Sequence, residues 1–294
     1  MKGAAARVAG LGIWRSRVEP VPLAGGMTNE NFTVVDQGQK YVVRVGSDVL
    51  EHGVMRFAEV AASRAAAAAG IAPEVVHSEP GILVLAFIEG RTLTPEDVRK
   101  RAMQARIVPL LRRCHLDVPL HLRGPVLAFW VFHVLRDYGH RLADRGHCYS
   151  GRLAEWATVA GRLERAVGPI DLVFGHNDLL AANLIDDGRR LWLLDFDYAG
   201  FNSPLFDLGG LASNSELSNE DREFLLEAYF ERPVDDRLRL QGQAMLTASL
   251  LREAMWSMVS ELGSRIEMDF RPYTEENLAR FERALVDFDA MERS

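Results

Sequence analysis

The stretch that decides the fold is GHNDLLAANLIDDGRRLWLLDFDYAG, residues 175–200. Its first half has the spacing H-x-D-x-x-x-x-N, in which Asp178 and Asn183 are the acidic and amide members. An apolar run at 191–194 predicts a short strand that leads directly into Asp195. Phosphoryl transfer needs such a set, because one carboxylate must orient and deprotonate a hydroxyl while an amide and a second carboxylate hold Mg²⁺ against the phosphates.

Each member of this set has an expected role. We predict that Asp178 is the base that acts on an acceptor hydroxyl. Asn183 and Asp195 are predicted to bind Mg²⁺, which prefers hard oxygen ligands. Asp197 follows two residues after Asp195, so in an extended segment the two face the same way. We therefore predict that Asp197 also binds a metal, with a helix cap or a surface turn as the alternative.

Two further residues are expected to hold the loop in shape. His176 is predicted to orient it through hydrogen bonds rather than to catalyse, and Asp207, in SPLFDLGG, is predicted to brace it. Protein kinases have the same order of motifs, H-R-D-L-x-x-x-N followed by a strand and D-F-G. The second motif here reads D-F-D, which predicts a kinase-like site that does not belong to a protein kinase.

Composition narrows the class of protein. The 294 residues are 48% hydrophobic and 26% charged, as in ordinary globular enzymes. A net charge of −7 argues against a nucleic-acid partner, and no apolar run approaches a membrane span. The start, MKGAAARVAGLGIW, lacks the continuous apolar core of a signal peptide. We expect a cytoplasmic protein with no membrane insertion, whose Cys114 and Cys148 are both reduced.

The order of predicted elements indicates an α+β fold with two lobes. Strands are predicted at residues 18–23, 31–35, 41–45, 74–77 and 82–87, with one helix at 55–69. Helices dominate afterwards, at 95–116, 128–144, 153–167, 219–230, 235–261 and 274–291. We predict a small antiparallel-sheet lobe at 1–88 and a larger, mainly helical lobe at 89–294. The site is expected in the cleft between them.

The small lobe offers candidates for binding phosphate. Two glycines let a backbone approach an anion, and neighbouring polar groups can donate to it, although a plain hairpin turn is the alternative. These candidates are Gly25, Gly26, Thr28 and Asn29. Arg44 is a lone charge in the apolar strand YVVRV and needs a partner if it is buried. We predict that it pairs with Glu59 on the single helix, the alternative being a strand edge that reaches solvent.

The C-terminal part offers an aromatic set. An aromatic cage with a carboxylate would hold a quaternary ammonium through cation–π attraction, whereas plain helical core packing is the alternative for each ring. The candidates are Tyr198, Trp256, Phe270 and Tyr273, with Asp269 or Glu253 as the carboxylate.

Taken together, these segments resemble a known family. The whole chain is similar to the choline/ethanolamine kinase branch of the aminoglycoside-phosphotransferase-like superfamily, and to its bacterial members in particular. The matching segments are GGMTNENF (25–32), YVVRV (41–45), FIEGRTL (87–93), HNDLLAANLI (176–185), DFDYAGFNSPLFDL (195–208), LREAMWSMVSELGS (251–264) and MDFRPYTEENLARF (268–281). The resemblance implies a bilobal protein-kinase-like fold, ATP with Mg²⁺ as the donor, Asp178 as base, and Asn183 and Asp195 as metal ligands.

The predicted function is an ATP-dependent kinase of an amino alcohol, choline or ethanolamine first. Thiamine or an aminoglycoside is the alternative acceptor, and a pseudokinase that binds without turnover is the alternative from a different class. The segment 235–261 is apolar enough to pack either in the core or at a dimer face, so a homodimer is possible.

Overall fold

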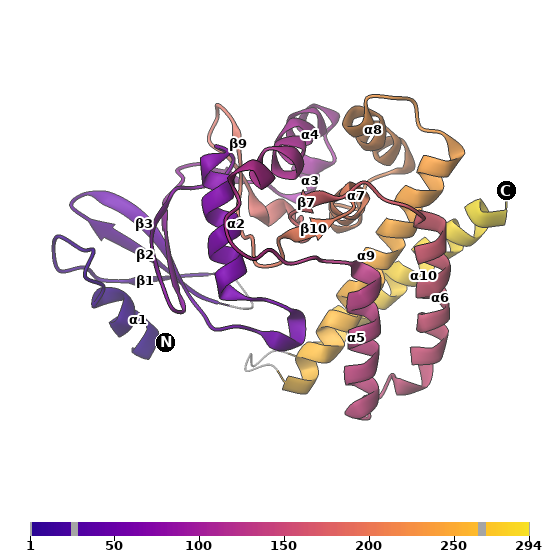
Figure 1. Cartoon of the computed structure of the whole chain (residues 1–294), viewed down its shortest axis with the longest axis horizontal. Helices are drawn as coiled ribbons and strands as arrows, with labels where there is room; N and C mark the ends of the chain where they lie inside the picture. The colour runs from indigo at the N-terminus through magenta and orange to yellow at the C-terminus, as the bar shows by residue number, and fades with distance from the viewer. Residues whose placement is uncertain (1, 25–28, 264–268, 294) are drawn as a thin grey trace.

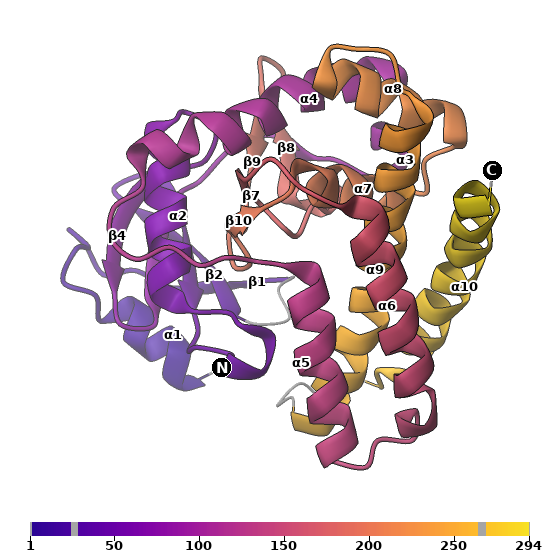
Figure 2. The same ribbon diagram turned by 45° about the vertical axis from the view of Figure 1, so that its right-hand side comes forward.

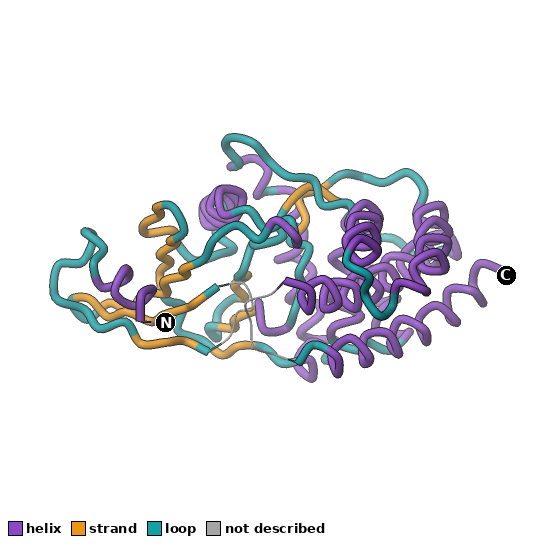
Figure 3. The backbone as a smooth tube through the Cα atoms, turned by 90° about the horizontal axis from the view of Figure 1, so that it is seen from below, coloured by secondary structure: helices purple, strands orange, loops and turns teal. Residues whose placement is uncertain are grey.

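A five-stranded antiparallel sheet forms the N-terminal part of the chain, with the strand order β1-β2-β3-β5-β4. The computed structural model describes residues 2–24, 29–263 and 269–293. The strands are β1 (Val21–Leu23), β2 (Glu30–Asp36), β3 (Gln39–Val45), β4 (Val75–Glu79) and β5 (Ile82–Ala86). Gln37 and Gly38 have φ values of 51° and 81°, so a tight two-residue turn joins β2 to β3. Figure 3 shows the sheet strands near the N-terminus, at the end of the molecule opposite the C-terminus.

The two faces of this sheet have different partners because successive strand residues point to opposite sides. Val43 and Val45 are buried on one side, in a cluster that includes Val8 of α1 (Lys2–Ala9). Arg44, between them, points to the other side and meets Glu59 of α2 (Arg56–Ala68). The alternation in YVVRV therefore aims the charge at the helix. Figure 1 shows α2 lying between the sheet and the rest of the molecule.

Short strands carry the catalytic segments. They are β6 (Arg91–Thr92), β7 (Val173–Gly175), β8 (Leu184–Asp186), β9 (Leu191–Leu193) and β10 (Gly200–Asn202). β7 pairs with β10, and β8 lies between β6 and β9. The loop that carries Asp178 runs from β7 to β8 and ends in a 3-10 turn at Ala181–Asn183. Because β9 pairs with β8, the acids that follow β9 return to the same region as that loop.

Helices make up most of the remainder. They are α3 (Pro95–Val98), α4 (Arg101–Leu116), α5 (Val131–Asp144), α6 (Leu153–Val167), α7 (Pro204–Asn214), α8 (Asn219–Phe230), α9 (Asp236–Gly263) and α10 (Arg271–Arg293). Further 3-10 turns lie at Leu50–His52, Val118–His121 and Ser150–Arg152. α9 is buried on every side from Gln243 to Ser260 and packs against α5, α6, α7 and α10 (Figure 2). This segment therefore belongs to the core, although it also buries polar residues such as Gln243, Thr247 and Arg252.

The predicted α+β bilobal architecture is confirmed, and two details are corrected. The small lobe was predicted to have one helix, but α1 is a second one, which packs Val8 against the sheet. The segment 95–116 forms two helices, because Lys100 takes an extended conformation (φ −76°, ψ 121°). Thr94 caps α3 as predicted, in a reciprocal capping box with Asp97. The lobe boundary near residue 88 stays a prediction, since Ala62 of α2 packs in the larger apolar cluster. None of the helices within the described residues has the length and apolar character needed to cross a membrane.

Candidate active site

A buried aspartate holds the catalytic loop in place. Asp207 of α7 accepts hydrogen bonds from the backbone N–H groups of His176 and Asn177, each at 2.7 Å. Its Oδ2 atom also lies 2.9 Å from Nε2 of His115. His176 contributes separately, because its Nε2 atom lies 2.7 Å from the carbonyl oxygen of Leu194. The predicted roles of Asp207 as a brace and of His176 as an orienting residue are confirmed.

Asp178 lies at the end of this braced loop and keeps part of its side chain exposed. Burial raises the pKa of its carboxyl to about 8, and the charges of Glu253, Asp195 and Asp197 act in the same direction. Arg252 opposes them. A carboxylate whose pKa lies near neutrality is suited to accept a proton from an alcohol.

Asn183 and Asp195 fit a magnesium site. The Nδ2 atom of Asn183 donates to the carbonyl oxygen of Asp178 at 2.9 Å, which leaves its Oδ1 atom as an acceptor. Asp195 has a φ of 63°, an uncommon value for a residue other than glycine that is concentrated at functional sites. No group of three or more His, Cys, Asp and Glu side chains placed to hold a metal occurs within the described ranges. The donor set still suits Mg²⁺, which takes few protein ligands together with substrate phosphates.

Arg44 is the centre of a buried ion-pair network. Its Nε atom lies 2.8 Å from Oε1 of Glu59, which confirms the predicted pair. Its Nη2 atom lies 2.8 Å from an oxygen of Asp195 and 2.8 Å from an oxygen of Asp197. Although burial disfavours the charge, these three carboxylates raise the pKa of Arg44 above its ordinary value. The network therefore joins the sheet to the segment after β9.

Replacing Arg44 with lysine tests this network. One ammonium cannot reproduce the planar fork that reaches three carboxylates, so the free energy of unfolding should fall by about 1–3 kcal/mol. Chemical denaturation measures the change, with Arg64→Lys as the matched control. Arg64 is an exposed residue of α2 that donates to Ser78. Equal stability of the two variants would show that Arg44 acts only as a diffuse positive charge.

The structure places Asp197 inside this network. One of its oxygens is held by Arg44 and by Arg56, and the other accepts from Nδ2 of Asn29 at 3.2 Å. Both oxygens are therefore occupied by residues of the N-terminal part, whereas Asp195 is bonded to Arg44 through Oδ1. Metal binding by Asp197 stays a prediction. The predicted phosphate-binding residues Gly25, Gly26 and Thr28 lie outside the described residues.

The predicted aromatic residues come together around Trp256. Nε1 of Trp256 donates to the hydroxyl of Tyr198 at 2.9 Å. The ring of Trp256 lies 6.2 Å from that of Phe270 and 6.5 Å from that of Tyr273, centroid to centroid, with both pairs edge to face. Asp269 is exposed and accepts a hydrogen bond from the backbone N–H of Arg271. Burial raises the pKa of Tyr273, and the negative charges of Glu253 and Asp178 act in the same direction.

Sequence reasoning missed two buried groups beside these rings. Arg252 places its guanidinium carbon 4.5 Å from the ring centroid of Tyr198 and bonds Glu253 through Nη1. His52 stacks on Trp256 with 5.1 Å between the ring centroids. The i, i+4 spacing of Arg252 and Trp256 places both on one helix face, but it does not show that Arg252 is buried. Nothing local marks His52, because its partners lie far along the chain.

The pKa of His52 gives a prediction about acid stability. Its ring nitrogens lie 3.0 Å from the Tyr138 hydroxyl and 2.9 Å from the Ser260 hydroxyl. Burial, together with the charges of Arg252 and Arg141, lowers its pKa to about 3. The unfolded chain therefore binds more protons between pH 6.5 and 3, and the free energy of unfolding falls as the pH falls through that window.

The measurement is the free energy of unfolding against pH for the wild type and for His52→Gln. We expect the wild type to lose up to about 1.4 kcal/mol per pH unit more than the variant in this window. His133→Gln is the control, because His133 is an exposed residue of α5. Parallel curves for all three proteins would contradict the burial of a neutral His52.

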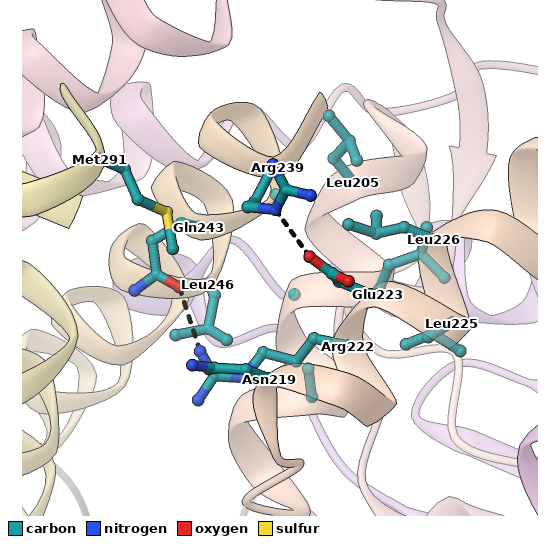
Figure 4. A pocket seen from close by; sticks show the side chains of 14 residues that line it. Leu205, Asn219, Arg222, Glu223, Leu225, Leu226, Arg239, Gln243, Leu246 and Met291 are labelled. Atoms are coloured by element: carbon teal, nitrogen blue, oxygen red, sulfur yellow. Dashed lines mark hydrogen bonds and ion pairs between the residues drawn. The ribbon is translucent and has the colours of Figure 1, made fainter. Parts of the chain in front are cut away.

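A separate cavity of about 120 Å³ lies between α7, α8, α9 and α10 (Figure 4). Its walls include Leu205, Leu226 and Leu246. Arg222 lines it and donates to Gln243, and Arg239 pairs with Glu223. The cavity shares no lining residue with the catalytic set and is not the candidate site.

The fold and the site define the class of protein. Phosphotransferases of the protein-kinase-like class hold a strand cation against a helix glutamate and place the catalytic loop beside the nucleotide phosphates. Arg44 and Glu59 stand in this relation to Asp195 and to the loop of Asp178. The chain therefore belongs to that class.

Comparison with known proteins gives the family. Residues 21–216 match the profile of the choline/ethanolamine kinase family, so the chain belongs to it. These kinases are phosphotransferases that act on an alcohol group. Protein LicA of Haemophilus influenzae is 29% identical over 215 residues, which cover 71% of this chain and 62% of that relative. The chain thus spans less than two thirds of that relative's length.

Solved structures agree on the fold. A choline/ethanolamine kinase family protein from Mesorhizobium loti is 26% identical, with a TM-score of 0.77 and coverage of 99% of this chain and 97% of that one. A crystal structure of LicA in complex with AMP has a TM-score of 0.74 at 21% identity, covering 99% and 98% of the two chains.

Proposed function

We propose that the protein transfers the terminal phosphoryl group of ATP to the hydroxyl of an amino alcohol, with choline and ethanolamine as the first candidates. The observation that carries the proposal is the position of Asp178. Its partly exposed carboxylate interacts electrostatically with Asp195 and Asp197 of the Arg44 network, which suits nucleotide phosphates, and with Tyr198 and Tyr273 of the aromatic set. Family membership and the AMP complex of a structural neighbour support a nucleotide donor.

Each side chain has a defined task in this reaction. Asp178 accepts the proton of the acceptor hydroxyl and so aligns its oxygen. Asn183 and Asp195 hold Mg²⁺, and Arg44, itself fixed by Glu59, lies beside the same acids. When bound, Mg²⁺ neutralises charge on the phosphates. Nearby positive charge also favours the ionised form of a carboxylate, which suits Asp178 to act as a base.

Recognition of the amine is assigned to the aromatic residues around Trp256 and to Glu253. Trp256, Phe270 and Tyr273 supply ring surface, and Glu253 supplies negative charge. A cation near a ring gains up to about 2 kcal/mol when it is desolvated. Arg252 lies against the ring of Tyr198, so Tyr198 acts mainly as the hydrogen-bond partner that fixes Trp256. Asp269 is retained as a candidate only for the outer edge of the site, because it is exposed.

The test is release of ADP from ATP and Mg²⁺ with choline, ethanolamine, thiamine or kanamycin, against a control with no acceptor. Turnover with choline or ethanolamine alone supports the proposal. Turnover with thiamine or kanamycin instead would move the acceptor to another hydroxylated amine. Nucleotide binding without turnover on any acceptor would favour a pseudokinase. The proposed location is the cytoplasm, where ATP is available, and a homodimer stays a prediction.

A further inference from the structure

Arg252 is a buried cation with hydrogen-bond donors that have no partner among the described residues. Its side chain is 5% exposed, and its Nη1 atom bonds Glu253. Its Nε and Nη2 atoms are buried and have no hydrogen-bond partner among the described residues. The aromatic neighbours do not remove this deficit, because Arg252 lies against the ring faces of Tyr198 and Phe129, and the Tyr198 hydroxyl accepts from Trp256. Buried polar groups are almost always hydrogen-bonded, so two free donors on one cation require an explanation.

The two free atoms indicate the shape of the missing partner. Nε and Nη2 form one edge of the planar guanidinium, the edge that binds two oxygens of a single oxyanion in parallel. Nη1, on the other side, is the atom that Glu253 takes. The ion pair with Glu253 therefore accounts for Nη1 and leaves the Nε–Nη2 edge buried without a hydrogen-bond partner among the described residues.

The position of Arg252 indicates which oxyanion this is. It lies one helical turn before Trp256 on α9 and contacts Tyr198, so it belongs to the acceptor side of the site. Its charge also acts on Asp178. Arg44, Asp195 and Asn183 form the donor side. When the phosphoryl group has been transferred to the acceptor, it is an oxyanion next to Asp178 on the acceptor side.

We infer that Arg252 binds the phosphoryl oxygens of the phosphorylated product through Nε and Nη2. This inference rests on the proposed function. In the reaction, a bond forms between the acceptor oxygen and the terminal phosphorus of ATP. The bond from that phosphorus to the bridging oxygen breaks, its electron pair stays with ADP, and the hydroxyl proton passes to Asp178. Arg252 stabilises the charge that arrives with the phosphoryl group.

The experiment compares product and acceptor affinity by calorimetry, with Mg²⁺ and without nucleotide. The ligands are phosphoethanolamine, ethanolamine and inorganic phosphate. In Arg252→Gln, the ratio of the product to the acceptor dissociation constant should rise about tenfold or more over the wild type. Arg252→Lys, which keeps the charge and loses the fork, should lie between them. Arg222→Gln, at the cavity of Figure 4, is the matched control and should leave the ratio unchanged.

Several results would overturn the inference. One is an unchanged ratio in folded Arg252 variants. Another concerns L-serine, which is ethanolamine with an added carboxylate. If serine binds the wild type more tightly than ethanolamine and Arg252→Gln abolishes that gain, the fork serves an acceptor carboxylate instead.

The wild type alone gives a test that does not depend on the variants folding. Inorganic phosphate should compete with phosphoethanolamine and leave ethanolamine binding unchanged, and absence of that competition refutes the inference. Failure of the proposed function is a distinct result. In that case no acceptor yields ADP, while phosphate still binds in a manner that depends on Arg252.

Discussion

Asp178→Asn should lower kcat on the order of 10³-fold while nucleotide affinity changes by less than about threefold. Asparagine keeps the size of the side chain and its oxygen, but it cannot accept a proton. The loop should keep its shape, because Asp207 and not Asp178 fixes the backbone at His176 and Asn177. The loss should therefore appear in turnover and not in stability.

The measurements are steady-state ADP release and binding of a nucleotide in the absence of acceptor. Asp171→Asn is the matched control, because Asp171 is an exposed aspartate just before β7. It should retain wild-type turnover. Near-normal turnover in Asp178→Asn would show that Asp178 is not the base and that its negative charge has no catalytic role.

The sequence was sufficient to predict parts of the site whose residues lie close together in the chain. Asp178, Asn183 and Asp195 lie within one short stretch of the chain, so motif spacing alone predicts that they share a site. The Arg44–Glu59 pair was predictable for a different reason. A charge in an apolar strand needs a partner, and the small lobe offered one helix to supply it. The ion pair with an N–O distance of 2.8 Å follows from that requirement.

The sequence was insufficient where a site depends on tertiary contacts. His52 meets Ser260, which is 208 residues away, and no local pattern encodes that contact. Metal binding by Asp197 stays a prediction, but its contacts with Arg56 and Asn29, more than 140 residues away, are not encoded in any local pattern. Arg252 was overlooked because an arginine within a helix usually extends its charge to solvent. Only the packing around α9 shows that this one is enclosed.

Asp207→Ala should lower the free energy of unfolding by about 3–5 kcal/mol, because it leaves buried donors without their acceptor. Two backbone N–H groups and His115 lose the carboxylate that they share. Burial alone would raise the pKa of Asp207, but these hydrogen bonds outweigh it and hold the pKa below its ordinary value. The stabilisation is thus complete above the pKa of an unfolded aspartate and is lost as the pH falls through the lowered value.

Denaturant unfolding of Asp207→Ala, Asp207→Asn and Asp289→Asn separates this brace from an ordinary ion pair. Asp207→Asn keeps one acceptor oxygen and should lose about 1–3 kcal/mol. Asp289 pairs with Arg162 at a partly exposed position, so its variant should lose about 1 kcal/mol or less. Loss of the Asp207 carboxylate should also lower turnover, because His176 and Asn177, which it holds, directly precede Asp178. If Asp207→Ala is as stable as Asp289→Asn and still active, the loop is held by β7 and β8 and not by the buried carboxylate.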